Sequence, residues 1–83
     1  MNKVLVKLYV PIIEAEYDVW LPLNKKIYSV IELLTKAVGE FSGGYYMPEK
    51  MPLLYDKQTA IKYDLNKTVK ETTIRNGTEI ILI

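Results

Sequence analysis

The sequence predicts an α+β fold: a mixed sheet of four or five strands with one amphipathic helix packed on one of its faces. Three observations support this prediction. Apolar and polar residues alternate over residues 3–10 and 15–21, as in half-buried strands. The period then changes from two to 3.6 between residues 24 and 39. A further aliphatic run closes the chain at residues 78–83. Because one helix is all that is available to cover the apolar strand positions, it must lie on one face of the sheet.

Composition indicates one domain, residues 1–83, with ordinary contents of hydrophobic (49%) and charged (25%) residues. The net charge is +1, from 11 basic and 10 acidic residues whose signs alternate along the chain, which gives no support to binding of nucleic acid or an anionic membrane. The chain has no cysteine, so disulfides and thiolate chemistry are excluded. No segment approaches the ~20 apolar residues of a membrane span, so we expect no direct membrane insertion and a soluble, cytoplasmic protein.

The first two strands are predicted to form a β-hairpin, with Pro11 and Pro22 ending its two runs. One face would carry Val4, Val6, Leu8 and Val10 from the first strand and Ala15, Tyr17, Val19 and Leu21 from the second. The opposite face would carry Lys3, Leu5, Lys7 and Tyr9 with Glu16, Asp18 and Trp20.

A helix is predicted to follow, with Asn24 as its N-cap and Gly39 as its stop signal. Its apolar stripe consists of Ile27, Val30, Ile31, Leu34 and Val38. Leu34 lies in the middle of the stripe and is expected to be buried beneath the sheet.

The next segment, residues 39–52, is predicted to be a loop because it holds three of the four glycines and two of the four prolines. Residues 53–56 and 59–63 are predicted to be short strands around the turn Asp56-Lys57-Gln58-Thr59.

The last part of the chain begins with one predicted helical turn at residues 68–71, where Thr68 and Glu71 have the spacing of a capping box. Asn76-Gly77 predicts a turn before the final strand at 78–83. A terminal strand that stays apolar to its final residue is expected to be buried between two neighbours, so we place it at the sheet centre, parallel to the first strand.

This order of elements is that of the β-grasp, and the residues resemble ubiquitin-like proteins over essentially the whole chain. The most specific stretch is DLNKTVKETTIRNGTEIILI, residues 64–83. The resemblance implies that Val69, Ile74, Ile80 and Leu82 lie in the core and that Ile81 and Ile83 face outward.

Within that superfamily, the segments SGGYYMP, LLYDKQT and NGTEIILI look most like the YukD/EsaB group of type VII (WXG100/ESX) secretion systems. The resemblance implies a small cytoplasmic accessory of a secretion machine that works by protein–protein contact. Two alternatives remain open: a ubiquitin-like carrier or modifier whose tail is lost or processed, and a β-grasp scaffold of some other complex.

Ubiquitin and the sulfur carriers are activated through a flexible tail that ends in Gly-Gly. This sequence ends in Leu82-Ile83, directly from the predicted strand. Comparison with the family therefore leads us to expect that the chain as given is not conjugated through its C-terminus.

Residue types that catalyse reactions or bind metals are scarce in the sequence. It has no His and no Cys, and neither Ser29 nor Ser42 lies near a candidate base. Glu16 and Asp18 share a strand face, as paired carboxylates would, but a solvated face with lysine partners on the neighbouring strand is the stronger interpretation. The SGGYY segment lacks the lysine of a phosphate loop. The sequence therefore indicates a non-enzymatic protein with no cofactor and no metal.

The face of the sheet turned away from the helix, called the open face below, carries the candidate interaction residues Leu5, Tyr9, Trp20, Ile81 and Ile83. Together they are predicted to form a contiguous apolar patch larger than a monomer usually exposes. Such a patch would bind a protein partner, either a component of the secretion machine or a second copy of the chain. The family resemblance agrees, because the open face of ubiquitin-like folds is their usual partner-binding surface. The alternative is that the 39–52 loop covers this face as a lid, with Phe41, Tyr45, Tyr46 and Met47.

Overall fold

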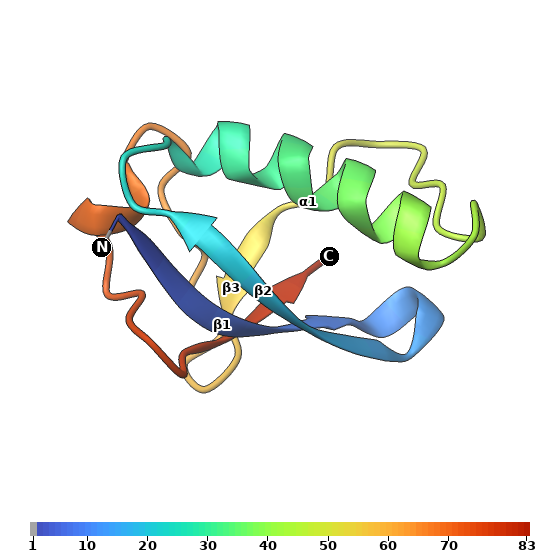
Figure 1. Ribbon diagram of the computed structural model, residues 1–83, viewed down its shortest axis with the longest axis horizontal. Coiled ribbons are helices and arrows are strands. Elements are labelled where there is room, and N and C mark those ends of the chain that lie inside the picture. Colours follow the sequence, from blue (N-terminus) through green and yellow to red (C-terminus); the bar gives the residue numbers. More distant parts are fainter. Residues whose placement is uncertain (1) are drawn as a thin grey trace.

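A computed structural model describes residues 2–83, and this part of the chain forms a four-stranded sheet with one α-helix on one of its faces (Figure 1). The strands are β1 (Lys3–Val10), β2 (Ala15–Pro22), β3 (Leu54–Asp56) and β4 (Glu79–Leu82). The helix α1 spans Ile27–Phe41, and short 3₁₀ turns η1 and η2 span Pro11–Ile13 and Val69–Glu71. The strand order β2-β1-β4-β3 is that of the predicted β-grasp.

The two central strands run parallel, as predicted from their aliphatic sequences. Leu8 of β1 lies beside Ile80 of β4, and Val6 of β1 lies opposite Val19 of the antiparallel strand β2. β3 pairs antiparallel with the other side of β4. Helix α1 crosses over these strands, and the apolar side chains of one sheet face pack against it to form the core. The helical stripe is buried as predicted, at Ile27, Val30, Ile31, Leu34 and Val38.

Pro22 lies inside β2 as its last residue, although the sequence analysis placed it after the strand. It pairs with Lys3, while the N–H of the next residue, Leu23, donates to the carbonyl of Asn2 (2.8 Å). In an antiparallel ladder the backbone groups of successive residues point in opposite directions. The nitrogen of Pro22 therefore points away from β1, and its missing N–H costs no ladder hydrogen bond.

The start of α1 differs from the prediction, because Lys26 rather than Asn24 is the N-cap. The side chain of Lys26 makes no capping hydrogen bond. Instead, the N–H of Ile27 donates to the carbonyl of Lys67 (2.8 Å), and the N–H of Tyr28 donates to that of Leu65 (3.2 Å). The first N–H groups of the helix are thus satisfied by a distant part of the backbone, which replaces the side-chain cap.

Gly39 does not end the helix, which continues to Phe41. The left-handed backbone that stops it comes at Gly43 (φ 67°) and Gly44 (φ 87°), and the N–H of Gly44 donates to the carbonyl of Gly39 (2.7 Å). Glycine adopts such φ values without the steric penalty of other residues, which makes these two positions the helix terminator.

Residues 59–63 are not a strand, contrary to prediction. Tyr55 and Lys62 form an isolated bridge, and the N–H of Asp56 donates to the carbonyl of Ile61 (3.0 Å). Ala60 has a left-handed backbone (φ 60°), which interrupts the extended conformation that a longer ladder needs. The segment therefore lies along the outer side of β3 without extending the sheet.

The turn after β3 is held by Asp56. Its Oδ1 accepts hydrogen bonds from the N–H groups of Gln58 (2.8 Å) and Thr59 (3.0 Å), and its Oδ2 accepts one from Tyr63 Oη (3.2 Å). These hydrogen bonds hold the pKa of Asp56 below its usual value, and the one from the Thr59 N–H has the largest effect. Burial is the main cause that raises the pKa of Tyr63 to about 12, and the negative charge of Asp56 adds to it.

Because the pKa of Asp56 is lower in the folded chain than in the unfolded one, its carboxylate stabilises the fold above about pH 4. That stabilisation should be lost as the pH falls through the lower, folded pKa. We expect the free energy of unfolding to fall more steeply below pH ~4 in the wild type than in Asp56→Asn, which keeps an acceptor oxygen but does not titrate. Urea unfolding at several pH values measures both slopes. Equal slopes would contradict the assignment.

The predicted capping box lies at η2. Glu71 Oε1 accepts hydrogen bonds from the Thr68 N–H (2.9 Å) and from the Thr68 hydroxyl (3.1 Å). These hydrogen bonds hold the pKa of Glu71 below its usual value, and the one from the Thr68 N–H has the largest effect. The four core positions that the family resemblance implied in this region, Val69, Ile74, Ile80 and Leu82, are all buried.

Candidate interaction face

Side chains of the open face form three rows across the sheet, set by the strand register. In the first row, Trp20 of β2 lies beside Leu5 of β1. The second row consists of the charged residues Lys7, Asp18 and Glu79, which are described below. In the third row, Tyr9 of β1 lies beside Ile81 of β4, which in turn pairs with Tyr55 of β3. Four of the five predicted residues thus share the open side of the sheet. The fifth, Ile83, lies just beyond the end of β4 and donates its N–H to the carbonyl of Leu53 (3.0 Å).

Exposure differs along this face. Trp20 is 54% exposed and Leu5 is 37% exposed, while Tyr9, Ile81 and Tyr55 are partly buried. Ile83 is 67% exposed. The prediction that the Trp20 side chain lies away from the helix is confirmed.

A row of charged residues divides the apolar side chains of the open face. Lys7 lies opposite Asp18 on one side and beside Glu79 on the other. All three point to the open face, because they lie two residues from Leu5, Trp20 and Ile81 respectively. The expectation of one contiguous apolar patch is therefore wrong, and the face consists of a Leu5–Trp20 pair and a Tyr9–Ile81–Tyr55 row.

Lys57 is a further residue of this face, and it was not among the predicted residues. Its Nζ lies 5.3 Å from the centroid of the Tyr9 ring, 3.6 Å from Glu79 Oε2 and 4.0 Å from Glu16 Oε2. Solvent-exposed ion pairs of this kind contribute little to stability. The contact instead covers part of the Tyr9 ring with a lysine side chain. The signal that could have found Lys57 is its position one residue after β3, which continues the outward alternation from Tyr55.

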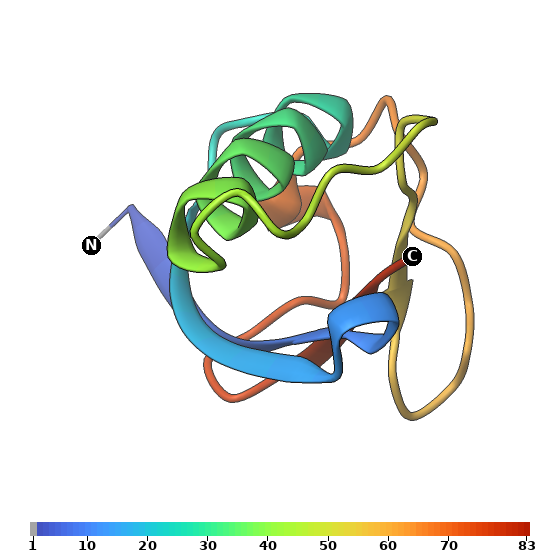
Figure 2. The same cartoon turned by 90° about the vertical axis from the view of Figure 1, so that its right-hand side faces the viewer.

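The loop after α1 does not form the alternative lid. Tyr46 is buried in the core, and its N–H donates a hydrogen bond to Ser42 Oγ (2.9 Å). The Phe41 ring lies 5.3 Å from the ring of Tyr17, which points to the helix side of the sheet. Figure 2 shows the loop running beside the helix, on the same side of the sheet. The lid interpretation is therefore wrong, while Tyr45 and Met47 are exposed to solvent.

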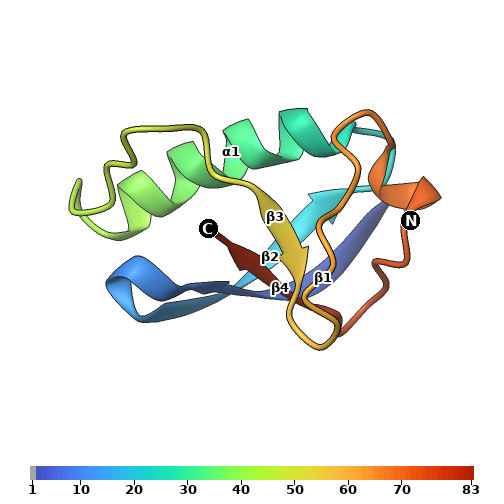
Figure 3. The same ribbon diagram turned by 180° about the vertical axis from the view of Figure 1, so that it is seen from behind.

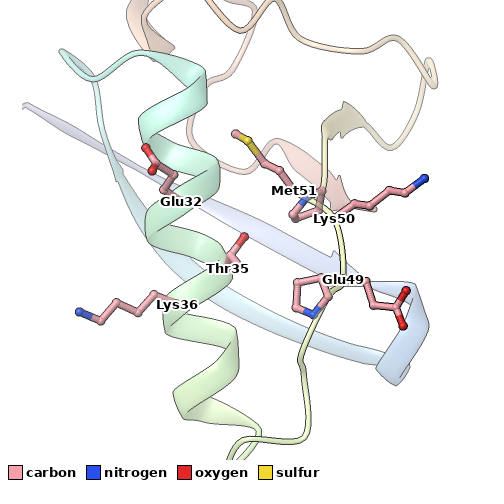
Figure 4. Close-up of a pocket in the computed structure, with 8 residues that line it drawn as sticks. Glu32, Thr35, Lys36, Glu49, Lys50 and Met51 are labelled. Carbon is pink, nitrogen blue, oxygen red and sulfur yellow. The ribbon is translucent and has the colours of Figure 1, made fainter.

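A hollow of about 430 Å³ lies between α1 and this loop (Figure 4). Lys36 and Glu32 point away from the loop, and Thr35 faces it. The Thr35 hydroxyl already donates to the carbonyl of Ile31 within the helix (2.7 Å). Over residues 2–83, the His, Cys, Asp and Glu side chains form no cluster of three or more that could hold a metal ion. The hollow therefore offers shape but no arrangement of groups that points to a particular reaction.

Comparison with solved structures identifies the fold. The chain superposes on the ubiquitin-like domain of EccD5 from Mycobacterium xenopi with a TM-score of 0.82 at 17% identity, covering 100% of this chain and 94% of that one. It superposes on the ubiquitin-like domain of the Mycobacterium tuberculosis type VII secretion system protein EccD1 with a TM-score of 0.78 at 13% identity, covering 100% and 99%. The fold is thus the ubiquitin-like β-grasp.

A third match is a chain of the MycP5-free ESX-5 inner membrane complex, with a TM-score of 0.82 at 15% identity. The comparison covers 100% of this chain but 21% of that one, so the chain spans about a fifth of the protein it matches there. By sequence, no family model matches the chain, and no curated protein does so either. Among residues 2–83, no helix is both long enough and apolar enough to cross a membrane.

Proposed function

We propose that this chain is a non-enzymatic protein–protein interaction module, a cytoplasmic ubiquitin-like accessory of a type VII secretion system of the YukD/EsaB kind. The likeness to the ubiquitin-like domains of EccD5 and EccD1 supports the link to this class of secretion machine. The sequence segments that resemble the YukD/EsaB group support the narrower assignment.

The observation that carries the proposal is the exposed aromatic and aliphatic surface of the open face. Trp20 and Leu5 lie side by side and are 54% and 37% exposed. Burying an exposed tryptophan against a partner is a common source of binding energy, since interface hot spots are enriched in this residue. Tyr9 and Ile81 provide a second, partly buried apolar row, and the charges of Lys7, Asp18 and Glu79 between the rows would orient the partner.

The partner we propose is a protein component of the secretion complex, with a second copy of the chain as the alternative. The ESX-5 match is a chain of an inner membrane complex, and this chain would bind to such a complex through surface contact. The proposed contact residues are Leu5, Tyr9, Trp20, Ile81 and Ile83.

Replacement of Trp20 by alanine is expected to weaken association with that partner by about 2 kcal/mol or more, roughly 30-fold in Kd. The free energy of unfolding should change less, because more than half of the side chain is already exposed to solvent. Titration calorimetry and urea unfolding measure the two effects. Ile12→Ala is the matched control, since Ile12 is 80% exposed but lies in η1, outside the open face. A larger loss of stability than of affinity would contradict the interface role.

The partner can be identified by placing a photo-crosslinking amino acid at position 5 or 9 in the host cell. We expect crosslinks to a type VII secretion component, and loss of secreted WXG100 proteins when the gene is deleted. Unchanged secretion after deletion, together with crosslinks only to unrelated proteins, would overturn the proposal.

A further inference from the structure

Within residues 2–83, the outer edge of β2 is the unpaired edge of the sheet. At the opposite side of the sheet, residues 61–63 lie along β3, where the N–H of Tyr63 donates to the carbonyl of Leu54 (3.0 Å), as can be followed in Figure 3. No strand or loop within residues 2–83 pairs in the same way with the outer side of β2, which is eight residues long. A long unpaired edge of this kind is a template for another strand.

The register shows which backbone groups this edge presents. The odd-numbered residues of β1 bond toward β4, since the N–H of Lys7 donates to Thr78 and the carbonyl of Leu5 accepts from Gly77. The even-numbered residues of β1 therefore bond to β2, and their partners there are odd-numbered, such as Val19 opposite Val6. It follows that Glu16, Asp18 and Trp20 direct their backbone N–H and C=O groups outward.

An apolar groove of about 320 Å³ runs beside this edge, between β2 and α1. Its helix side is formed in part by Leu33, Ala37 and Phe41, which recur every four residues and so lie on one stripe of the helix. Leu33 is 52% exposed and Phe41 is 58% exposed. This stripe is separate from the buried core stripe, and it leaves apolar side chains in solvent next to an unpaired strand.

Charge distinguishes between the possible occupants of the edge. Glu16 and Asp18 both lie on β2 with their side chains on the open face, and both are exposed. Pairing β2 with β2 of a second copy would bring carboxylates of the two copies together, which is destabilising across strands. Lysine or arginine side chains at the same positions of an added strand would instead form favourable cross-strand pairs.

We propose that the outer edge of β2 binds an extended segment of another protein as an added strand, with alternating apolar and basic residues. Its backbone would pair with Glu16, Asp18 and Trp20, its apolar side chains would enter the groove against Leu33 and Phe41, and its basic side chains would lie opposite the carboxylates. This inference goes beyond the proposed function, because it uses the sheet edge instead of the open face and does not depend on a role in secretion.

The probe is a capped peptide of about nine residues in which valine and lysine alternate, a length that matches β2. The chain has one tryptophan, so its fluorescence reports on Trp20 alone. On adding the peptide we expect a blue shift of this fluorescence and slower amide hydrogen exchange at Asp18 and Trp20. A peptide with glutamate in place of lysine should bind roughly tenfold more weakly.

Matched variants separate the groove from the open face. Leu33→Asn should weaken peptide binding by roughly tenfold while keeping the fold, since the side chain is about half exposed. Ile12→Asn, at an exposed site outside the groove, should leave binding unchanged. Equal binding of the two peptides, protection confined to Leu5, Tyr9 and Ile81, or no saturable binding would each overturn the proposal. So would sedimentation showing that the chain dimerises through β2.

Discussion

Replacing Leu34 with alanine should lower the free energy of unfolding by about 2–5 kcal/mol. Leu34 is 4% exposed and lies in the middle of the buried stripe of α1. The substitution removes three buried carbon atoms and leaves a cavity that the surrounding core can fill only in part. In a domain of this size, that loss is a large share of the total stability.

Leu33→Ala is the matched control, because it makes the same chemical change one residue earlier in the same helix. Leu33 is 52% exposed, and we expect its replacement to cost less than about 1 kcal/mol. Urea unfolding followed by circular dichroism measures both variants. A loss below about 1 kcal/mol for Leu34→Ala would show that the buried face of α1 is wrongly assigned.

Ile80→Ala should be comparably destabilising, with an expected loss of about 2–5 kcal/mol. Ile80 is completely buried and lies in β4 between Leu8 of β1 and Asp56 of β3. Its side chain packs on the helix side of the sheet, where both central strands contribute to the core.

Ile81→Ala provides the comparison within the same strand. Ile81 points to the open face and is only partly buried, so its replacement should cost less than half as much as that of Ile80. Thermal unfolding of the two variants under identical conditions tests the difference. Equal losses of stability in the two variants would contradict the assignment of Ile80 to the core and Ile81 to the open face.

The fold was predictable from the sequence because the buried positions repeat with the period of each element. The alternation through residues 3–10 and 15–21 and the stripe from Ile27 to Val38 each record which side of the element faces the core. The central position of β4 followed from the uninterrupted aliphatic residues 80–83 that close the sequence. These signals are local in sequence, and each shows directly which residues of one element are buried.

The element boundaries were less predictable because distant residues determine them. Asn24 has the side chain of a good N-cap, but the carbonyl groups of Leu65 and Lys67 satisfy the first N–H groups of the helix. Gly39 could have ended the helix, yet the left-handed residues follow at Gly43 and Gly44. Local propensity favours Asn24 and Gly39 as the helix ends and does not include the distant carbonyl groups that decide where the helix begins.

The candidate face was predicted in part. Strand alternation correctly placed Trp20 and Leu5 on the side away from the helix. The division of the face by Lys7 depends on how three strands align, and the approach of Lys57 to Tyr9 depends on where the turn after β3 lies. Neither can be derived from the pattern of one segment. The groove beside β2 arises between a strand and a helix that meet only in the folded chain.

The parallel pairing of β1 with β4 also has a consequence for the order of events during folding. Lys7, Leu8 and Tyr9 find their partners at residues 79–81, near the other end of this sequence. Contacts between such distant positions require closure of a long loop before they gain any energy, which slows folding. During synthesis, the β1–β2 hairpin and α1 can form early, but the core between them stays incomplete until β4 leaves the ribosome. The nascent chain is therefore expected to depend on chaperones or to remain open to proteases until that last strand inserts.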